Sequence, residues 1–115
     1  MDTLEIIEYA TSKPNAMREY KPAWQAEVIK VGDKMFAFMS RNKEGEKIVN
    51  LKNDPETNAS LREQYPEFVE AGYYSNKEHW NSWYYDQPNF DNELLKEQID
   101  RSYELVAKNI TKKRK

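Results

Sequence analysis

Several residue types are rare or missing in this sequence, and each absence excludes a class of site. There is no cysteine, which excludes a disulfide framework, a zinc ribbon and a thiol nucleophile. The three glycines are isolated, so there is no phosphate-binding loop of the P-loop or dinucleotide-binding type. The single histidine, His79, lacks a GxSxG-type serine partner and cannot by itself supply a zinc or iron site. We therefore expect no metal, no cofactor and no enzymatic activity.

Long apolar runs are also missing. No segment approaches the roughly 20 apolar residues that span a bilayer. The opening stretch Met1–Glu5 carries acids where a secretory signal would carry basic residues. We expect a cytoplasmic protein without membrane association. The length of 115 residues predicts one domain, residues 1–115, that is large enough to fold around its own core.

Capping residues and apolar spacing predict a first helix over residues 2–12. Asp2 can act as the N-cap, with Glu5 completing a capping box. Leu4, Ile7, Ala10 and Thr11 recur at helical spacing, which supports this helix.

Two further helices follow from the same signals. Asp54 and Pro55 read as an N-cap with proline at the first helical position, opening a helix that ends near residue 64. Asp91 is expected to cap a long final helix. The predicted inward stripe of that helix is Leu95, Ile99, Ser102, Val106 and Ile110.

The stretches rich in β-branched and aromatic residues predict strands. Residues 26–31 and 34–39 flank the two-residue turn 32–33, and the longer turn 42–45 leads into 47–52, giving a three-stranded antiparallel meander. In the last of these strands, Val49 and Leu51 share one face and Asn50 and Lys52 the other.

A second pair of strands is expected over residues 68–74 and 81–85, joined by residues 76–79 as a turn or short helical link. The order of elements is then helix, strands, helix, strands, helix. Because this order lacks βαβ alternation, it predicts an α+β fold in which helices pack on a mainly antiparallel sheet.

The charges nearly cancel overall, at −2, but they are unevenly distributed. Residues 28–53 carry a net charge of +3, and residues 54–85 carry −4. With Lys34 and Lys43 near the two hairpin turns, the basic side chains could meet DNA phosphates as paired wings. Lysines at strand edges also prevent edge-to-edge aggregation in proteins that bind no nucleic acid. The basic residues are Lys30, Lys34, Arg41, Lys43, Lys47 and Lys52.

A dense aromatic cluster allows a second interpretation. Aromatic side chains can fill a core or stack on a planar ligand. The alternative to DNA binding is a small-molecule or protein interaction module with an aromatic pocket around Trp80, Trp83 and Tyr85, in which Trp80 reaches the ligand. The cluster comprises Tyr73, Tyr74, Trp80, Trp83, Tyr84 and Tyr85.

Polar residues in the strand 47–52 and in the link 76–79 allow a polar pocket. Asn50 and Lys52 point away from the buried side of their strand, and Asn76, Lys77 and His79 lie in the tight link. All five could converge as hydrogen-bond donors. Alternatively, Asn50 and Asn76 satisfy backbone groups at turns, and Lys52 lies near the acidic start of the next helix.

Four short motifs together resemble the MmcQ/YjbR family of small bacterial proteins, which are usually described as DNA-binding. The resemblance covers nearly the whole chain. It implies a secretion-chaperone-like or CyaY-like α+β fold and a double-wing arrangement that contacts DNA. The motifs are Asn50-Leu51-Lys52 with Asp54-Pro55, Gln64-Tyr65-Pro66, Asn76-Lys77 with His79-Trp80, and Ser102-Tyr103-Glu104-Leu105-Val106.

One departure from the family pattern matters. Family members commonly read Tyr-His-Met-Asn-Lys where this chain reads Tyr73-Tyr74-Ser75-Asn76-Lys77, so it lacks that histidine. Our hypothesis is a non-enzymatic, bacterial, cytoplasmic protein that binds DNA weakly and in a salt-sensitive manner. The expected DNA-contacting residues are Lys30, Lys34, Arg41, Lys43, Lys47, Asn50, Lys52, Asn76, Lys77, His79 and Trp80.

Overall fold

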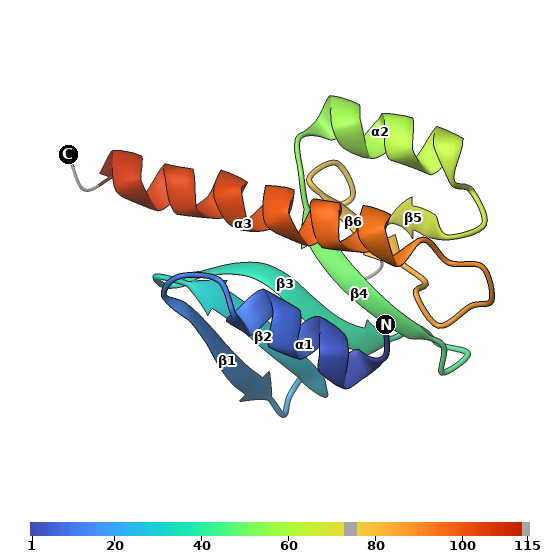
Figure 1. Cartoon of the computed structure of the whole chain (residues 1–115), viewed down its shortest axis with the longest axis horizontal. Helices are drawn as coiled ribbons and strands as arrows, with labels where there is room; N and C mark the ends of the chain where they lie inside the picture. Colours follow the sequence, from blue (N-terminus) through green and yellow to red (C-terminus); the bar gives the residue numbers. More distant parts are fainter. Residues whose placement is uncertain (73–75, 114–115) are drawn as a thin grey trace.

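The computed structural model describes residues 1–72 and 76–113, and places three helices against a six-stranded sheet (Figure 1). The sheet order is β1-β2-β3-β4-β6-β5, and all neighbouring strands are antiparallel. The predicted α+β fold is thus confirmed. The elements are α1 (Thr3–Thr11), β1 (Ala16–Lys21), β2 (Ala26–Val31), β3 (Lys34–Arg41), β4 (Lys47–Lys52), α2 (Pro55–Gln64), β5 (Val69–Ala71), β6 (Trp80–Trp83) and α3 (Asn92–Lys113).

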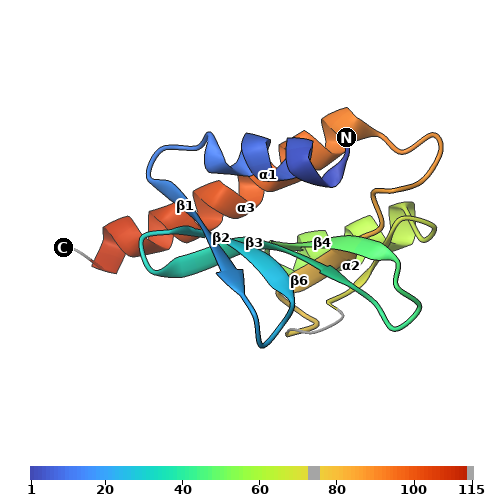
Figure 2. The same ribbon diagram turned by 90° about the horizontal axis from the view of Figure 1, so that it is seen from below.

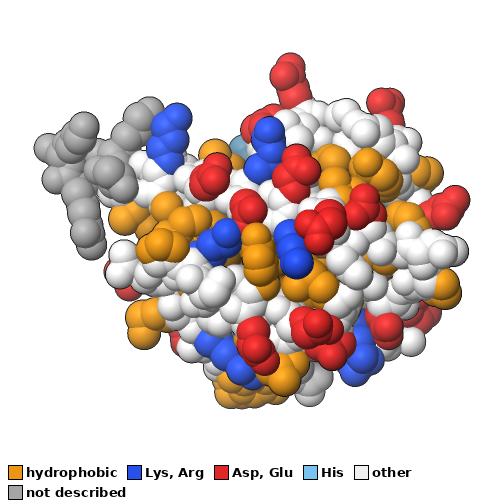
Figure 3. All heavy atoms as spheres, viewed as in Figure 1, with side chains coloured by type: hydrophobic (Ala, Val, Ile, Leu, Met, Phe, Trp, Pro, Cys, Tyr) orange, Lys and Arg blue, Asp and Glu red, His pale blue; other side chains and the backbone are white. Residues whose placement is uncertain are grey.

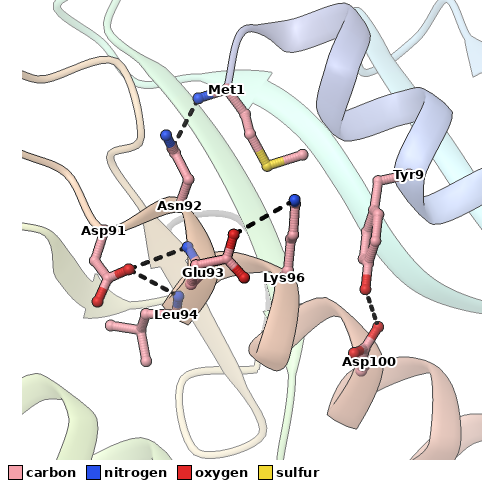
Figure 4. A network of polar contacts seen from close by, with 8 residues as sticks. All are labelled: Met1, Tyr9, Asp91, Asn92, Glu93, Leu94, Lys96 and Asp100. Carbon is pink, nitrogen blue, oxygen red and sulfur yellow. Dashed lines mark hydrogen bonds and ion pairs between the residues drawn. The ribbon is translucent and has the colours of Figure 1, made fainter.

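The main core lies between one face of the sheet and the helices, with α1 and α3 side by side over that face (Figure 2). Polar contacts join α1 to α3 (Figure 4). The Tyr9 hydroxyl donates to the Asp100 carboxylate at 2.7 Å, and the N-terminal ammonium donates to Asn92 Oδ1, also at 2.7 Å. Asp91 accepts from the amides of Glu93 and Leu94, which confirms its predicted capping of α3.

The N-terminal helix forms where expected, and Ile7 and Ala10 of its apolar spacing are buried. Asp2 and Glu5 make both halves of the capping box. Leu4, at the same spacing, is 55% exposed. Ile6 and Ile7 fill the core together with Ala10, because the helix lies with this side against α3 and the sheet.

The sequence pattern missed the first strand. β1 pairs with β2 along its whole length, and its interior residues from Met17 to Tyr20 are exposed. An edge strand with little buried surface has no apolar alternation to mark it. The predicted three-stranded meander is therefore four-stranded.

A bulge in β3 changes which residues reach the core. Ile29 pairs with Ala37 and Lys30 with Met35, which leaves Phe36 as an extra residue on β3. A bulge of this kind turns two successive side chains toward the same side of the sheet. Both Phe36 and Ala37 belong to the main core, and the Phe36 ring meets Tyr103 of α3 edge-on at 5.3 Å.

The second strand pair forms as predicted but is shorter. β5 and β6 pair antiparallel, with residues 77–79 as the turn before β6. Tyr84 and Tyr85 lie beyond the end of β6. The predicted end of the earlier strand falls on residues 73–75, outside the described residues, as do Tyr73 and Tyr74 of the aromatic cluster.

Among the described residues, no helix has the combined length and apolar character that crossing a bilayer requires.

Replacing Asp54 by alanine should lower the free energy of unfolding by about 1 kcal/mol, because α2 loses its N-cap. Asp54 Oδ1 accepts from the Thr57 amide at 2.9 Å, and the Thr57 hydroxyl donates to Oδ2. These hydrogen bonds hold the pKa of the Asp54 carboxyl below its ordinary value of 3.8. The stabilisation is therefore present above pH 3.8 and is lost as the pH falls through the lower folded-state pKa.

Urea unfolding followed by circular dichroism tests this prediction. The difference between wild type and Asp54→Ala should be present at neutral pH and shrink in acid. Glu63→Ala, on the exposed side of the same helix, should change stability by less than about 0.5 kcal/mol. A difference independent of pH would contradict the assigned role of the carboxylate.

Candidate binding groove at one end of the sheet

The two hairpin turns that were expected to act as paired wings lie at opposite ends of the sheet (Figure 1). Consecutive turns of an antiparallel meander alternate between ends, and β3, which joins these two, is eight residues long. At about 3.3 Å per residue, Lys34 and Arg41 are separated by roughly 23 Å. Lys34 and Lys43 therefore do not lie side by side, and each belongs to a different end of the sheet.

At the turn between β3 and β4, basic side chains contact carbonyl and carboxylate groups of the same chain. Arg41 Nη1 donates to the Gly45 carbonyl at 2.7 Å, and Lys47 lies 3.9 Å from the Asp86 carboxylate. Glu44 and Glu46 belong to the same turn, and their amides both bond to Asn42 Oδ1. Opposite charges are thus interspersed at this end, which weakens its attraction for a polyanion.

Lys30 is also paired. Its Nζ lies 2.7 Å from Glu19 Oε1, and Lys21 approaches the same carboxylate at 3.0 Å. Glu19 lies on β1, the strand that the sequence did not predict, so this pairing could not be anticipated.

Lys34 and Lys52 differ from the other basic residues of the meander. Both line a groove of about 550 Å³ at the end of the sheet nearest the C-terminal end of α3. Within the described part of the chain, neither ammonium forms an ion pair. We call this site the lysine groove. It is lined by Lys34, Met35, Lys52, Trp80, Val106, Asn109 and Ile110.

The lysine groove forms where β3 and β4 separate. Their pairing ends at Ala37 and Leu51. Beyond that pair, the Ser102 hydroxyl of α3 replaces the missing ladder: it accepts from the Lys52 amide at 2.9 Å and donates to the Phe36 carbonyl at 2.5 Å. Ser102 is fully buried. The helix therefore holds the two diverging strands at a fixed separation, and the groove opens past this bridge.

The turn between β2 and β3 fixes the far wall. Gly32 has a φ of +61°, and a Cβ built on it would lie 2.8 Å from Ile110 Cδ1. Any other residue would be strained at this φ and would require the end of the Ile110 side chain to move. The sequence after Ile110 continues into four basic residues, 112–115. Over the face that α3 crosses, basic and acidic side chains are interspersed (Figure 3).

Asn50 does not lie in the groove. Its side chain is fully buried, with Nδ2 donating to the Phe38 carbonyl and to Ser40 Oγ, while Oδ1 accepts from the Ser82 hydroxyl. The predicted orientation away from the Val49 side is correct, but this face of the sheet is closed to solvent here. The predicted contact between Asn50 and DNA is therefore wrong.

The polar side chains of the link before β6, residues 76–79, are exposed, and two of them bond to nearby backbone groups. Asn76 Oδ1 accepts from the amides of Glu78 and His79, which agrees with its alternative role as a turn residue. Lys77 Nζ donates to the Gly72 carbonyl at 3.0 Å. His79 is exposed, and its carbonyl accepts from the Asn53 amide at 3.0 Å. The link thus precedes the groove residue Trp80 without converging with Asn50.

The three aromatic residues of the expected pocket are divided between two clusters. Trp83 and Tyr85 are buried in the main core. Trp80 belongs to a second cluster with Val28 and Phe38, and it is 8% exposed. Strand alternation explains why Trp80 and Trp83 face opposite sides of the sheet. A common pocket around these three residues is therefore wrong.

Two exposed aromatic residues were not anticipated. Tyr20 is 54% and Trp24 55% exposed, and both line a concavity of about 610 Å³ near Arg41. Glu27 also lines this concavity and forms an ion pair with Arg18, so the concavity contains both acidic and basic side chains. No spacing signal marks an aromatic side chain on an unpredicted edge strand or loop. Ser102 did carry a signal, because a polar residue in an otherwise apolar helix stripe indicates a buried hydrogen bond.

Comparisons with known proteins agree on the fold. The family model described as YjbR matches residues 11–105. A protein of Escherichia coli K12 named uncharacterized protein YjbR is 33% identical over 107 residues, which span 93% of this chain and 88% of the relative. A crystal structure of a Deinococcus radiodurans protein, described with the domain DUF419, has 29% identity and a TM-score of 0.81, covering 94% of this chain and 80% of that one. A Pseudomonas syringae protein with 24% identity and a TM-score of 0.71 covers 92% of this chain and 99% of its own, and has the same fold.

Proposed function

The chain belongs to the YjbR family, and we propose that it is a non-enzymatic protein that binds DNA weakly through phosphate contacts at the lysine groove. The observation that carries this proposal is the presence of two ammonium groups, of Lys34 and Lys52, that line one groove and make no ion pair among the described residues. A lysine without a carboxylate partner keeps its full charge available to a phosphate.

The last part of α3 carries a further exposed cation and is followed by basic residues in the sequence. Lys108 is exposed on the last turns of α3, and the four basic residues 112–115 follow in the sequence. The opposite end of β3 is less suited to a polyanion, because Glu44, Glu46 and Asp86 accompany its basic residues. We therefore propose that DNA contacts the lysine groove, and we do not propose that all six basic residues of the meander contact it together.

The expected affinity is low. The net charge is −2, and only a few phosphates can be neutralised at one end of a small domain. Dissociation constants should lie in the non-specific range of roughly 10⁻⁴ to 10⁻⁶ M at physiological salt. Binding should weaken steeply as salt rises, because each phosphate contact releases condensed counterions.

Charge reversal at the groove tests the proposal. Lys34→Glu combined with Lys52→Glu should abolish measurable binding to a fluorescently labelled duplex at low salt. Replacing both lysines by glutamine should lower the slope of log K against log salt by about 1.8, because two phosphate contacts are lost. The measurement is fluorescence anisotropy across a salt series.

The control reverses the charge of two lysines at the other end of β3. Lys43→Glu combined with Lys47→Glu should leave most of the affinity intact, although it changes the net charge equally. An equal loss in the two double variants would indicate a non-local charge effect. Absence of wild-type binding at low salt would contradict DNA binding itself.

A further inference from the structure

We infer that the lysine groove also binds a small amphipathic anion, with an apolar or planar body between its walls and an acidic head group on Lys34 and Lys52. Nothing in the family membership assigns such a ligand. The groove volume of about 550 Å³ falls in the range of roughly 300 to 1,000 Å³ that is typical of small-molecule sites.

The walls have the composition that an apolar body requires. Met35 and Trp80 contribute from β3 and β6, and Val106 and Ile110 from α3. Met35 and Ile110 are half-buried, whereas Trp80 and Val106 are only 8% and 3% exposed and form the closed base of the wall. Methionine adapts its unbranched side chain to irregular shapes. Trp80 is already fixed by its contact with Phe38, at 5.4 Å between ring centroids. A rigid wall of this kind loses little entropy when a ligand binds.

The polar groups at the groove select for negative charge. Its lining includes two lysines and the amide of Asn109, but no aspartate or glutamate. The concavity near Tyr20 and Trp24 is different, because Glu27 lies among its basic residues. Of these two concavities, the lysine groove is therefore the one suited to a carboxylate, sulfonate or phosphate head group.

The position of the head group implies competition. The anion would occupy the same two ammonium groups that our proposed function assigns to DNA phosphates, and this consequence rests on that function. A bound ligand should then displace DNA, because both would occupy the ammonium groups of Lys34 and Lys52. The small molecule would thus lower DNA binding by direct competition. The ligand site itself does not depend on DNA binding.

Two dyes that differ mainly in charge test the ligand site without DNA. The probe is 8-anilinonaphthalene-1-sulfonate, an aromatic sulfonate, and the comparison is neutral N-phenyl-1-naphthylamine. Wild-type protein should bind the sulfonate with enhanced fluorescence. Lys34→Gln combined with Lys52→Gln should weaken sulfonate binding by about tenfold or more, because charge-assisted contacts are lost, and should leave the neutral dye nearly unaffected.

Two further variants locate the site. Asn109→Trp, at an exposed position of the groove lining, should weaken binding of both dyes by filling the space. Lys43→Gln combined with Lys47→Gln should bind both dyes like wild type. Cooperative thermal unfolding of each variant separates dye binding to the folded groove from dye binding to a loosened core.

The outcomes distinguish the two proposals. Failure of the wild type to bind the sulfonate, or equal sulfonate affinity in the groove variant, would overturn the ligand site even if DNA binds. Sulfonate binding without displacement of labelled duplex would overturn the shared site and leave the ligand site standing. Sulfonate binding by a protein that shows no DNA affinity would support the ligand site and overturn only the DNA function.

Discussion

Replacement of Trp83 by alanine is expected to lower the free energy of unfolding by about 4 kcal/mol, a large share of the total for a domain of this size. Trp83 is 1% exposed on β6 and belongs to the main core. Its ring lies 6.5 Å from that of Tyr65 and 6.4 Å from that of Phe90, measured between centroids. Truncation would leave a cavity among α2, the sheet and the segment before α3.

Chemical unfolding followed by circular dichroism measures this loss. The matched control is Trp24→Ala, which removes the same side chain from a site that is 55% exposed. We expect the control to lose less than half as much stability, because less apolar area returns to water. Similar losses in the two variants would contradict the assignment of Trp83 to the core and of Trp24 to the surface.

Replacement of Ser102 by alanine is expected to cost about 2 kcal/mol. The reason is that one hydroxyl satisfies two backbone groups at once, the Lys52 amide and the Phe36 carbonyl. Without it, both groups remain in a water-poor environment with no partner. The effect should also be local: the Lys52 amide should exchange its hydrogen faster than other β4 amides.

Ser60→Ala provides the comparison, because Ser60 is exposed on α2 and its hydroxyl accepts from the Gln64 side chain on the same exposed helix face. Its replacement should change stability by less than about 0.5 kcal/mol. If Ser102→Ala proved equally mild, with unchanged exchange at Lys52, the hydroxyl would not be the bridge between β3 and β4. The same variant should also weaken dye binding, since the groove depends on that bridge.

Local signals predicted much of this fold correctly. The caps at Asp2, Asp54 and Asp91 mark true helix starts, because each carboxylate accepts from backbone amides within the next turn. The turn at Gly32 and the strands around it also follow from local preference. What these signals did not predict depends on tertiary context: β1 carries no apolar alternation, and the outward position of Leu4 is set by how α1 lies on the sheet.

The site was less predictable, for geometric reasons. Counting charges along residues 28–53 cannot reveal that Lys30 is neutralised by Glu19 on another strand. Antiparallel order does place the start of β3 and the end of β4 at one end of the sheet, but it does not reveal that α3 reaches this end and closes a groove beside Lys34 and Lys52. The sequence named both lysines, but only the structure separates them from the four that lie elsewhere.

The contact between the turn at Gly32 and the side chain of Ile110 affects the shape of the lysine groove. Since a methyl group at this position would press on the tip of the Ile110 side chain, and since Ile110 is part of the lining, a change in the turn is transmitted to the groove wall. Alanine in place of Gly32 would strain a backbone whose φ is +61° and would move the end of the Ile110 side chain. The shape of the proposed ligand site is thus set in part by a turn residue outside its lining.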